Sequence, residues 1–223
     1  MVIMNAPEYT PPVNEGLEIL YEDDYLLAVN KPSGLLSVPG RGPDKQDCLV
    51  SRVAVDYPGI LVVHRLDMAT SGVVVMALNK AVQAQLGKLF SQREVNKRYL
   101  AVVEGIMLDD NGTVDQPMIC DWPNRPRQKI DHEQGKPATT QYRVLDRDDV
   151  NMTTRVELVP ITGRTHQLRL HMQFIGHTIL GDRLYAGEEA LSKSGRLLLH
   201  ATELSFKHPV TGKVLQVFSQ PPF

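Results

Sequence analysis

Cysteine, net positive charge and long apolar runs are all scarce in this 223-residue sequence. The two cysteines, Cys48 and Cys120, lie far apart, so they form neither a disulfide framework nor a metal-binding motif and are typical of reduced thiols in a cytosol. No apolar run approaches the length that spans a bilayer, and the first residues lack the basic start and apolar core of a secretory signal. We therefore expect a cytoplasmic protein without a membrane partner.

The net charge of −2 excludes a protein that coats nucleic acid by bulk charge. The basic residues are nevertheless clustered, at residues 93–98, 125–129 and 164–169, whereas acidic clusters occupy other segments. Such segregation allows one positive face on a nearly neutral protein. The alternative is ordinary solvated surface, which is where most charged residues lie.

The composition, 42% hydrophobic and 22% charged, is typical of one large domain or of two tightly joined lobes. Residues 1–16 are mostly polar and contain three prolines, which predicts a flexible N-terminal tail; residues 17–223 are predicted to form the folded domain. Many predicted strands and few helices, without regular alternation of the two, indicate an α+β fold rather than a doubly wound parallel sheet.

Apolar periodicity gives the expected elements. Strands are predicted at residues 17–21, 25–29, 60–63, 73–78, 97–105, 139–145, 153–160, 196–201 and 214–218. Helices are predicted at residues 48–57, 79–94 and 165–175, with Asn79 as an N-cap and Gly176 as a stop signal. Residues 110–112 are predicted as a turn, and residues 117–129, which carry the only tryptophan, as an irregular segment.

Residues 64–72, His-Arg-Leu-Asp-Met-Ala-Thr-Ser-Gly, are the most informative segment. They lie between two predicted buried strands, so they are expected to form a loop on a rigid scaffold, where catalytic residues are often found. Asp67 is at the centre, and Arg65 lies two positions before it. A nearby guanidinium favours the anionic carboxylate, and an ionised Asp can act as a nucleophile or a base. The alternative is an Asp–Arg turn that merely closes a hairpin.

This segment resembles the central motif of the RluA family of pseudouridine synthases. Residues 30–35, 97–99, 161–169 and 197–201 resemble the other motifs of that family, so the resemblance covers most of the chain. Residues 36–41 and 119–126 resemble the member that gives the family its name more than its other members. Several relatives carry an RNA-binding module of the S4 type before the catalytic domain, and we expect none here because the first predicted strand begins at residue 17.

The resemblance implies the pseudouridine synthase fold, a mixed and largely antiparallel sheet with flanking helices and a central cleft. It also implies an isomerase that breaks the N1 glycosidic bond of uridine, turns the base and rejoins it through C5. The implied substrates are 23S rRNA and the tRNA anticodon stem-loop at position 32. No cofactor, metal or obligatory protein partner is expected for an isomerisation. A hydrolytic glycosidase would use two carboxylates, whereas this motif contains one.

Two alternatives stay open: a family member that acts on a different RNA uridine, and a non-catalytic RNA-binding protein. The second would be expected to lack one of the three residues that the resemblance identifies as catalytic, and all three are present. Asp67 is implied to be essential, either by attacking C1′ of the ribose or by removing a proton from C2′. Tyr99 is implied to stack on the flipped uracil, and Arg169 to pair with Asp67. The alternatives are a core tyrosine and a helix-surface arginine.

Arg65 is implied to enter the RNA stem where the target base has left it, because an enzyme that acts on a base must extrude it. Further RNA contacts are expected at His64, Arg41, Arg125, Arg127, Lys129 and Arg164. The histidines do not predict a metal site: His166 and His171 are five residues apart, which does not place both on one helix face, and no cysteine is near. We also expect His64 and His200 to be hydrogen-bonded structural residues.

Overall fold

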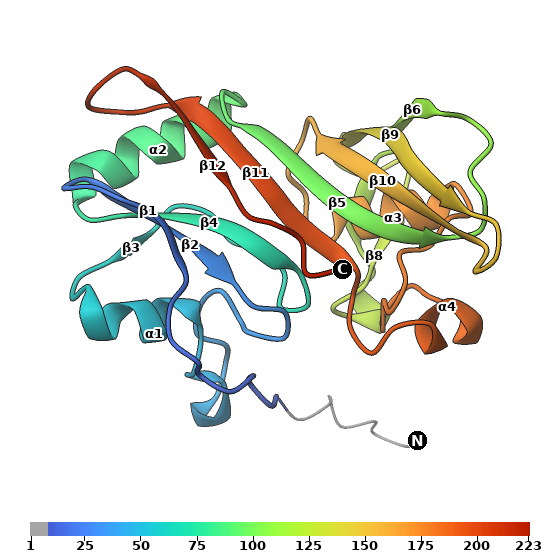
Figure 1. Ribbon diagram of the computed structural model, residues 1–223, viewed down its shortest axis with the longest axis horizontal. Helices are drawn as coiled ribbons and strands as arrows, with labels where there is room; N and C mark the ends of the chain where they lie inside the picture. Colours follow the sequence, from blue (N-terminus) through green and yellow to red (C-terminus); the bar gives the residue numbers. More distant parts are fainter. Residues whose placement is uncertain (1–8) are drawn as a thin grey trace.

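Figure 1 shows a computed structural model of the protein, which describes residues 9–223. In this part of the chain ten strands form one mixed sheet, in the order β1-β2-β4-β11-β5-β10-β9-β6, with β3 paired to β4 and β12 paired to β11. The strands are β1 (Ile19–Glu22), β2 (Leu26–Lys31), β3 (Leu61–Val62), β4 (Ser71–Ala77), β5 (Asn96–Glu104), β6 (Asn111–Asp115), β9 (Thr139–Asp148), β10 (Thr153–Pro160), β11 (Leu199–Lys207) and β12 (Val214–Phe218). Only β4 and β11 pair in parallel, so the expected α+β fold with a largely antiparallel sheet is confirmed.

A separate two-stranded sheet and several short helices complete the described fold. The strands of the small sheet are β7 (Met118–Cys120) and β8 (Gln128–Ile130). The helices are α1 (Leu49–Asp56), α2 (Lys80–Gln92), α3 (Gln167–Phe174) and α4 (Glu188–Ser192), with 3-10 turns η1 (Pro43–Lys45) and η2 (Trp122–Asn124). Within residues 9–223, no helix is both long enough and apolar enough to cross a membrane.

The first half of the sheet is covered on both faces. Alternate residues of a strand point to opposite faces, so Leu26 and Ala28 of β2 pack with α2, while Leu27 and Val29 pack with α1. All seven residues of β4 are buried, as expected for a strand with both faces covered. Figure 1 shows α2 above these strands and α1 below them.

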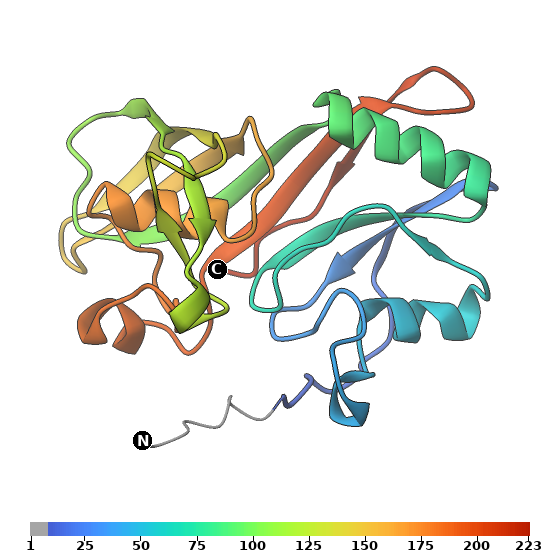
Figure 2. The same ribbon diagram turned by 180° about the vertical axis from the view of Figure 1, so that it is seen from behind.

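The second half of the sheet packs on α3. Leu168 and Met172 of that helix meet apolar residues of β5, β10 and β11. The opposite side of α3 packs against the β7–β8 hairpin, through Leu170, Met118 and Tyr185. In Figure 2 the hairpin lies in front of α3, and its end carries η2. The hairpin is thus the outer layer of this half.

The two halves meet where β4 pairs with β11, at Ser71↔His200 and Gly72↔Ala201. Gly72 has φ 115°, and a Cβ at this position would collide with the main chain of Ala201. Glycine therefore permits both this backbone conformation and the close approach of the two strands. The loop that precedes β4, which carries Asp67, is thereby placed at the boundary between the halves.

Several elements differ from their expected bounds. The apolar run 60–63 gives only the two-residue, half-buried β3. Residues 111 and 112 of the expected turn at 110–112 instead begin edge strand β6, where Gly112 pairs with Tyr142. Residues 117–129 are not irregular: β7 and β8 form a hairpin, but three-residue strands are too short to show a period of two.

Two boundaries shifted for identifiable reasons. The predicted strand at 196–201 begins later and continues to Lys207, because the alternation of buried and exposed residues runs on past residue 201. The helix predicted at 165–175 begins at Gln167, since His166 takes a left-handed conformation with φ 57°. Asn79 does cap α2, its side chain accepting a hydrogen bond from the Val82 amide at 2.9 Å.

Part of the expected flexible tail, residues 1–16, is fixed to the fold. Residues 1–8 lie outside the described residues. Tyr9 is 9% exposed, and its hydroxyl donates to the Asp47 carbonyl at 2.9 Å and accepts from the Leu36 amide at 3.0 Å. The Arg52 guanidinium donates to the Pro12 carbonyl at 2.6 Å. The segment from Tyr9 to Pro12 is therefore held against α1 and the loop before it.

Candidate active site

A cavity of about 260 Å³ lies at the boundary between the two halves. Its walls come from the loop before β4, from α2, β5 and β11, and from the segment between β10 and α3. It is slightly smaller than the sites that hold drug-sized ligands. Six of the expected site residues line it: His64, Arg65, Asp67, Tyr99, Arg164 and Arg169.

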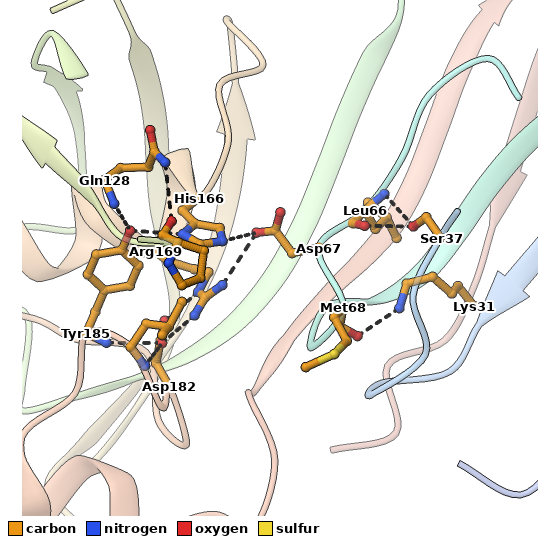
Figure 3. A network of polar contacts seen from close by, with 12 residues as sticks. Lys31, Ser37, Leu66, Asp67, Met68, Gln128, His166, Arg169, Asp182 and Tyr185 are labelled. Carbon is orange, nitrogen blue, oxygen red and sulfur yellow. Dashed lines mark hydrogen bonds and ion pairs between the residues drawn. The ribbon is translucent and has the colours of Figure 1, made fainter. Parts of the chain in front are cut away.

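The loop that carries Asp67 is held by hydrogen bonds to its backbone from Lys31, the last residue of β2, and from the loop that follows β2. The Lys31 ammonium donates to the Met68 carbonyl at 3.0 Å, and the Ser33 hydroxyl donates to the Ala69 carbonyl at 2.6 Å. The Ser37 hydroxyl donates to the Leu66 carbonyl at 2.7 Å and accepts from the Leu66 amide at 3.1 Å. The backbone on both sides of Asp67 is therefore fixed by a second loop (Figure 3).

Lys31, the last residue of β2, holds both loops together. It is fully buried and also donates to the carbonyls of Pro32 at 2.9 Å and Leu35 at 2.7 Å. Burial lowers its pKa to about 7, against the opposing effect of the Asp67 charge. The three carbonyl acceptors satisfy all three of its donors, so Lys31 ties the end of β2 to the Asp67 loop.

Arg169 connects Asp67 to a second, fully buried carboxylate. Its Nη1 lies 3.6 Å from Asp67 Oδ2, while its Nε and Nη2 donate to the two oxygens of Asp182 at 2.7 and 2.6 Å. Burial opposes the charge of Arg169, but the bonds to Asp182 and the two nearby carboxylates outweigh burial and raise its pKa. The paired geometry fixes the plane of the guanidinium, which aims its remaining nitrogen at Asp67.

A tyrosine and a histidine complete this network. Tyr185 is 4% exposed, and its hydroxyl accepts from the Gln128 amide at 2.8 Å and lies 3.0 Å from His166 Nδ1. His166 Nε2 lies 3.9 Å from Asp67 Oδ2. Burial lowers the pKa of His166, so its imidazole is neutral near pH 7. Figure 3 shows Asp67 pointing toward His166 and Arg169, on the opposite side from Lys31 and Ser37.

Tyr99 of β5 is half-buried and packs against the apolar clusters of both halves. Burial, and then the Asp67 charge, raise the pKa of its hydroxyl well above its usual value. The phenol therefore keeps its proton at physiological pH and can donate it in a hydrogen bond. Its ring lies in the wall of the cavity.

His64 also lies in the cavity wall, with two contacts inside the protein. Its Nε2 accepts from the Val75 amide at 3.0 Å, and its ring stacks on Phe90 with centroids 4.5 Å apart. Burial lowers its pKa to about 3, so the ring is neutral. The hydrogen-bonded structural role expected for His64 is thus observed, at a place that faces the cavity.

Four of the expected RNA contacts lie outside the cavity. Arg125, Arg127 and Lys129 belong to the β7–β8 hairpin, and Arg41 lies in the exposed loop before η1. The Lys129 ammonium is 3.2 Å from Asp131, and the Arg127 guanidinium lies over the Tyr185 ring at 5.5 Å. The hairpin is therefore connected to the cavity through Tyr185.

Among residues 9–223, no group of three or more histidine, cysteine, aspartate or glutamate side chains is arranged to hold a metal ion. His171, considered above with His166, is buried, with Nδ1 2.9 Å from Thr140 Oγ1 and Nε2 3.1 Å from the Gln116 carbonyl. Both of its ring nitrogens are therefore occupied within the protein.

His200 of β11 contacts Ser71, at the end of the Asp67 loop, and its burial makes stability depend on pH. It is fully buried between Ser71 Oγ at 2.8 Å and Ser219 Oγ at 3.1 Å, and burial lowers its pKa to about 4. An unfolded histidine titrates near 6.5, so between pH 6.5 and pH 4 the unfolded state binds a proton that the folded state does not. We expect the free energy of unfolding to fall by on the order of 2 kcal/mol from pH 7 to pH 4.5 through this residue.

Urea denaturation of wild type and His200→Gln at pH 7, 6, 5 and 4.5 tests this expectation. The variant should lose stability less steeply as the pH falls. His132→Gln, at an exposed histidine, is the matched control and should keep the wild-type slope. Equal slopes for wild type and His200→Gln would show that His200 is not the group that titrates.

Comparison with known proteins places these features in a family. A model of the RNA pseudouridylate synthase family matches residues 25–174, which include the Asp67 loop, Tyr99 and Arg169. The chain belongs to the RNA pseudouridylate synthase family. It is therefore an isomerase that forms pseudouridine in RNA, and the expectation from the resemblance is confirmed.

The chain is similar to curated proteins that share one name. It is 54% identical to the dual-specificity RNA pseudouridine synthase RluA of Escherichia coli strain K12, over 94% of this chain and 95% of that protein. It is 53% identical to the protein of the same name from Pasteurella multocida, over 96% of this chain and 97% of that one. The resemblance to the RluA family thus extends over nearly the full length of both chains.

Solved structures show the same fold. Human RNA pseudouridylate synthase domain containing 1 superposes with a TM-score of 0.80 at 31% identity, covering 96% of this chain and 87% of that one. Human RNA pseudouridylate synthase domain containing 4 gives a TM-score of 0.72 at 28% identity, covering 92% and 88%. The expected pseudouridine synthase fold is confirmed.

Sequence reasoning missed several residues that build the site. Asp182 and Tyr185 lie in a segment without apolar periodicity, and only their position after Gly181 in a Gly-Asp turn marks them. Lys31, Ser33 and Ser37 lie in or beside a recognised motif, but their contacts with the Asp67 loop join residues 29 to 37 positions apart. Their roles follow from the three-dimensional arrangement alone.

Proposed function

We propose that this enzyme converts uridine to pseudouridine in two RNAs, 23S rRNA and the anticodon stem-loop of tRNA at position 32. The support is the similarity to proteins named dual-specificity RNA pseudouridine synthase at 54% identity over 94% of the chain. The enzyme needs no cofactor for this isomerisation, and we propose that it works in the cytoplasm, where its two cysteines stay reduced.

We propose that Asp67 carries the chemistry, and its setting in the cavity is the observation on which this rests. The carboxylate is 28% exposed, faces the cavity and lies beside the buried Arg169 guanidinium. The guanidinium forms an ion pair with this carboxylate, with Arg169 Nη1 3.6 Å from Asp67 Oδ2. Both candidate first steps, attack at C1′ and removal of the C2′ proton, require that anion.

The second carboxylate of the network explains why the site suits isomerisation rather than hydrolysis. A glycosidase needs a free acid to protonate the leaving group and a carboxylate that acts on the sugar or on water. Both oxygens of Asp182 are held by Arg169, and Asp182 is fully buried. Asp182 therefore orients Arg169 and is not available to protonate a departing base.

Around Asp67 we assign roles to residues that line the cavity. Tyr99 stacks on the extruded uracil and offers a protonated hydroxyl. Arg65 and Arg164 are exposed at the cavity and meet the RNA backbone, with His64 in the wall beside them. Outside the cavity, Arg41, Arg125, Arg127 and Lys129 extend the contact with the RNA.

Incubation of the purified protein with a 23S rRNA fragment and with a tRNA anticodon stem-loop tests the substrate proposal. Pseudouridine is then mapped in each RNA, and in RNA from cells that lack the protein. Modification of both RNAs is expected. Modification of only one, or of a different uridine, would contradict the dual assignment.

Arg65 is expected to act in substrate opening more than in bond chemistry. It is exposed, two residues from Asp67, and lines the cavity. Extrusion of a stacked base costs a few kcal/mol, so Arg65→Ala should slow the reaction most on a structured stem-loop. On an RNA whose target uridine is already unpaired and unstacked, the loss should be about 10-fold smaller, because most of the extrusion cost is absent.

Single-turnover rates with RNA saturated by enzyme give the ratio of the two losses. Arg93→Ala, which changes an exposed arginine at the end of α2, is a matched control and should leave both rates near wild type. Equal losses of rate on the two RNAs would show that Arg65 acts only through its effect on the Asp67 carboxylate and not in extrusion of the base.

A further inference from the structure

The only tryptophan of the chain, Trp122, is 65% exposed in η2, at the end of the β7–β8 hairpin. The indole is the largest apolar side chain, and its exposure leaves a large flat surface in water. Tyrosine and tryptophan rings of this kind are the usual platforms on which unpaired bases stack. The catalytic roles assigned above do not use Trp122.

The segment around Trp122 is held in one conformation by its own hydrogen bonds. The Asp121 amide donates to the Arg127 carbonyl, and the Arg127 amide donates to the Asn124 carbonyl, both at 3.0 Å. The Asn124 amide and side chain donate to the carbonyl and the carboxylate of Asp121, at 3.0 and 2.9 Å. The indole is therefore presented on an ordered turn, which lowers the entropic cost of using it for binding.

One face of the indole is covered by a cation. The Arg125 guanidinium lies 4.6 Å from the ring centroid, while the ring keeps most of its surface exposed. Arg125 is itself exposed, and none of the ion pairs within residues 9–223 involves Arg125 or Arg127. The platform thus combines an open aromatic surface with positive charge that the protein has not neutralised, which is complementary to a nucleotide.

The hairpin is fixed relative to the cavity. The Gln128 amide donates to the Tyr185 hydroxyl, and that hydroxyl contacts His166, whose other ring nitrogen lies 3.9 Å from Asp67. Tyr185 also packs in one apolar cluster with Met118 of β7 and Leu170 of α3. The Trp122 turn therefore keeps a fixed position relative to the cavity.

We infer that Trp122 and Arg125 form a second base-binding site, which stacks an unpaired nucleotide of the same RNA outside the cavity. The base lies on the open surface of the indole, and the Arg125 guanidinium contacts a phosphate. The inference rests on the proposed stem-loop substrates, because their loops supply unpaired bases near the target uridine. It makes Trp122 a determinant of RNA preference and not of the bond chemistry.

The emission of the sole tryptophan provides a direct test. The Asp67→Asn variant is titrated with a labelled anticodon stem-loop and with a labelled 23S rRNA hairpin, and the anisotropy of the label gives binding independently of the indole. We expect the indole emission to be quenched with the same midpoint as the anisotropy. Trp122→Ala should weaken binding by about 5- to 150-fold, the range for loss of one stacked base, and Trp122→Phe by less.

Phe218→Ala is the matched control, because Phe218 is 60% exposed on β12 and belongs to neither the hairpin nor the cavity. It should leave binding and the indole quench unchanged. With wild-type Asp67, the single-turnover rate at saturating enzyme should change less in Trp122→Ala than the affinity does, whereas damage to the site would lower that rate.

The outcomes separate this inference from the proposed substrates. A stem-loop that produces no anisotropy change contradicts that substrate, and the indole emission is then measured with whichever RNA the enzyme binds. An RNA that binds without changing the indole emission, and with affinity unaltered by Trp122→Ala, overturns the inference.

Discussion

Asp67→Asn is expected to abolish pseudouridine formation, by roughly 10⁴-fold or more, the scale seen when a catalytic nucleophile or base is removed. The amide keeps the shape of the side chain but has neither the negative charge nor the nucleophilic oxygen. Leu66, Met68 and Ala69 hold the loop through their backbone, so the substitution leaves its conformation in place. RNA affinity should therefore stay within a few-fold of wild type.

Single-turnover assays and binding titrations on the same preparation measure the two quantities. Asp110→Asn removes a carboxylate of the same size at a 78% exposed position, where it pairs with Arg147, and should leave the rate unchanged. Turnover near the wild-type rate in Asp67→Asn would show that another residue carries the chemistry.

Asp182→Ala is expected to produce the second-largest effect, on both stability and rate. The substitution leaves the Arg169 guanidinium, which is 4% exposed, without its two principal acceptors. Breaking a buried ion pair by removing one partner costs about 3–5 kcal/mol, because the other charge stays buried. The backbone amides of Leu184 and Tyr185 also lose the acceptor they share. We expect a loss of this size in the free energy of unfolding.

The rate should fall as well, by about 100-fold, the order associated with a misplaced catalytic group. Arg169 without Asp182 is free to rotate toward Asp67, and the carboxylate then loses its set orientation. A positioning role lowers kcat in enzyme that is still folded, with RNA affinity largely kept. Asp182→Asn, which keeps one acceptor oxygen, should recover part of the rate.

Chemical denaturation and single-turnover rates at a temperature well below the transition separate the two effects. Asp110→Ala, at the exposed pair, is expected to change stability by less than about 1 kcal/mol. If Asp182→Ala lowers stability while folded enzyme retains the wild-type rate, Asp182 is a structural residue and its positioning role is wrong.

Sequence patterns predicted the elements whose signal is local. The all-buried β4 and the amphipathic α2 with its Asn79 cap follow from apolar periodicity and capping chemistry. The short β7 and β8 and the first residues of β6 do not, because a period needs more residues than they have. His166 departs from helical geometry because of contacts with residues distant in the sequence: its ring reaches Tyr185 and Asp67.

The residues of the site divide in the same way, into those with a local sequence signal and those without one. A motif led to Asp67, and resemblance to a family led to Tyr99 and Arg169, which do line one cavity. Asp182 could not be found in that way, because a single aspartate in an unpatterned segment gives no sign that it will meet an arginine 13 residues earlier. The positions of the arginines in the sequence do not show which of them are buried in the site. Arg169 is buried, whereas Arg125 is exposed.

The parallel pairing of β4 with β11 bears on the stage of synthesis at which the enzyme becomes active. Ser71 and His200, which face each other there, are 129 residues apart in the chain. Contacts between such distant residues form late, because the intervening chain must first be closed into a loop. A ribosome that has translated the Asp67 loop, Tyr99 and even Arg169 still carries an unfinished site. We therefore expect the nascent protein to become competent to modify RNA only after β11 has left the exit tunnel and docked against β4.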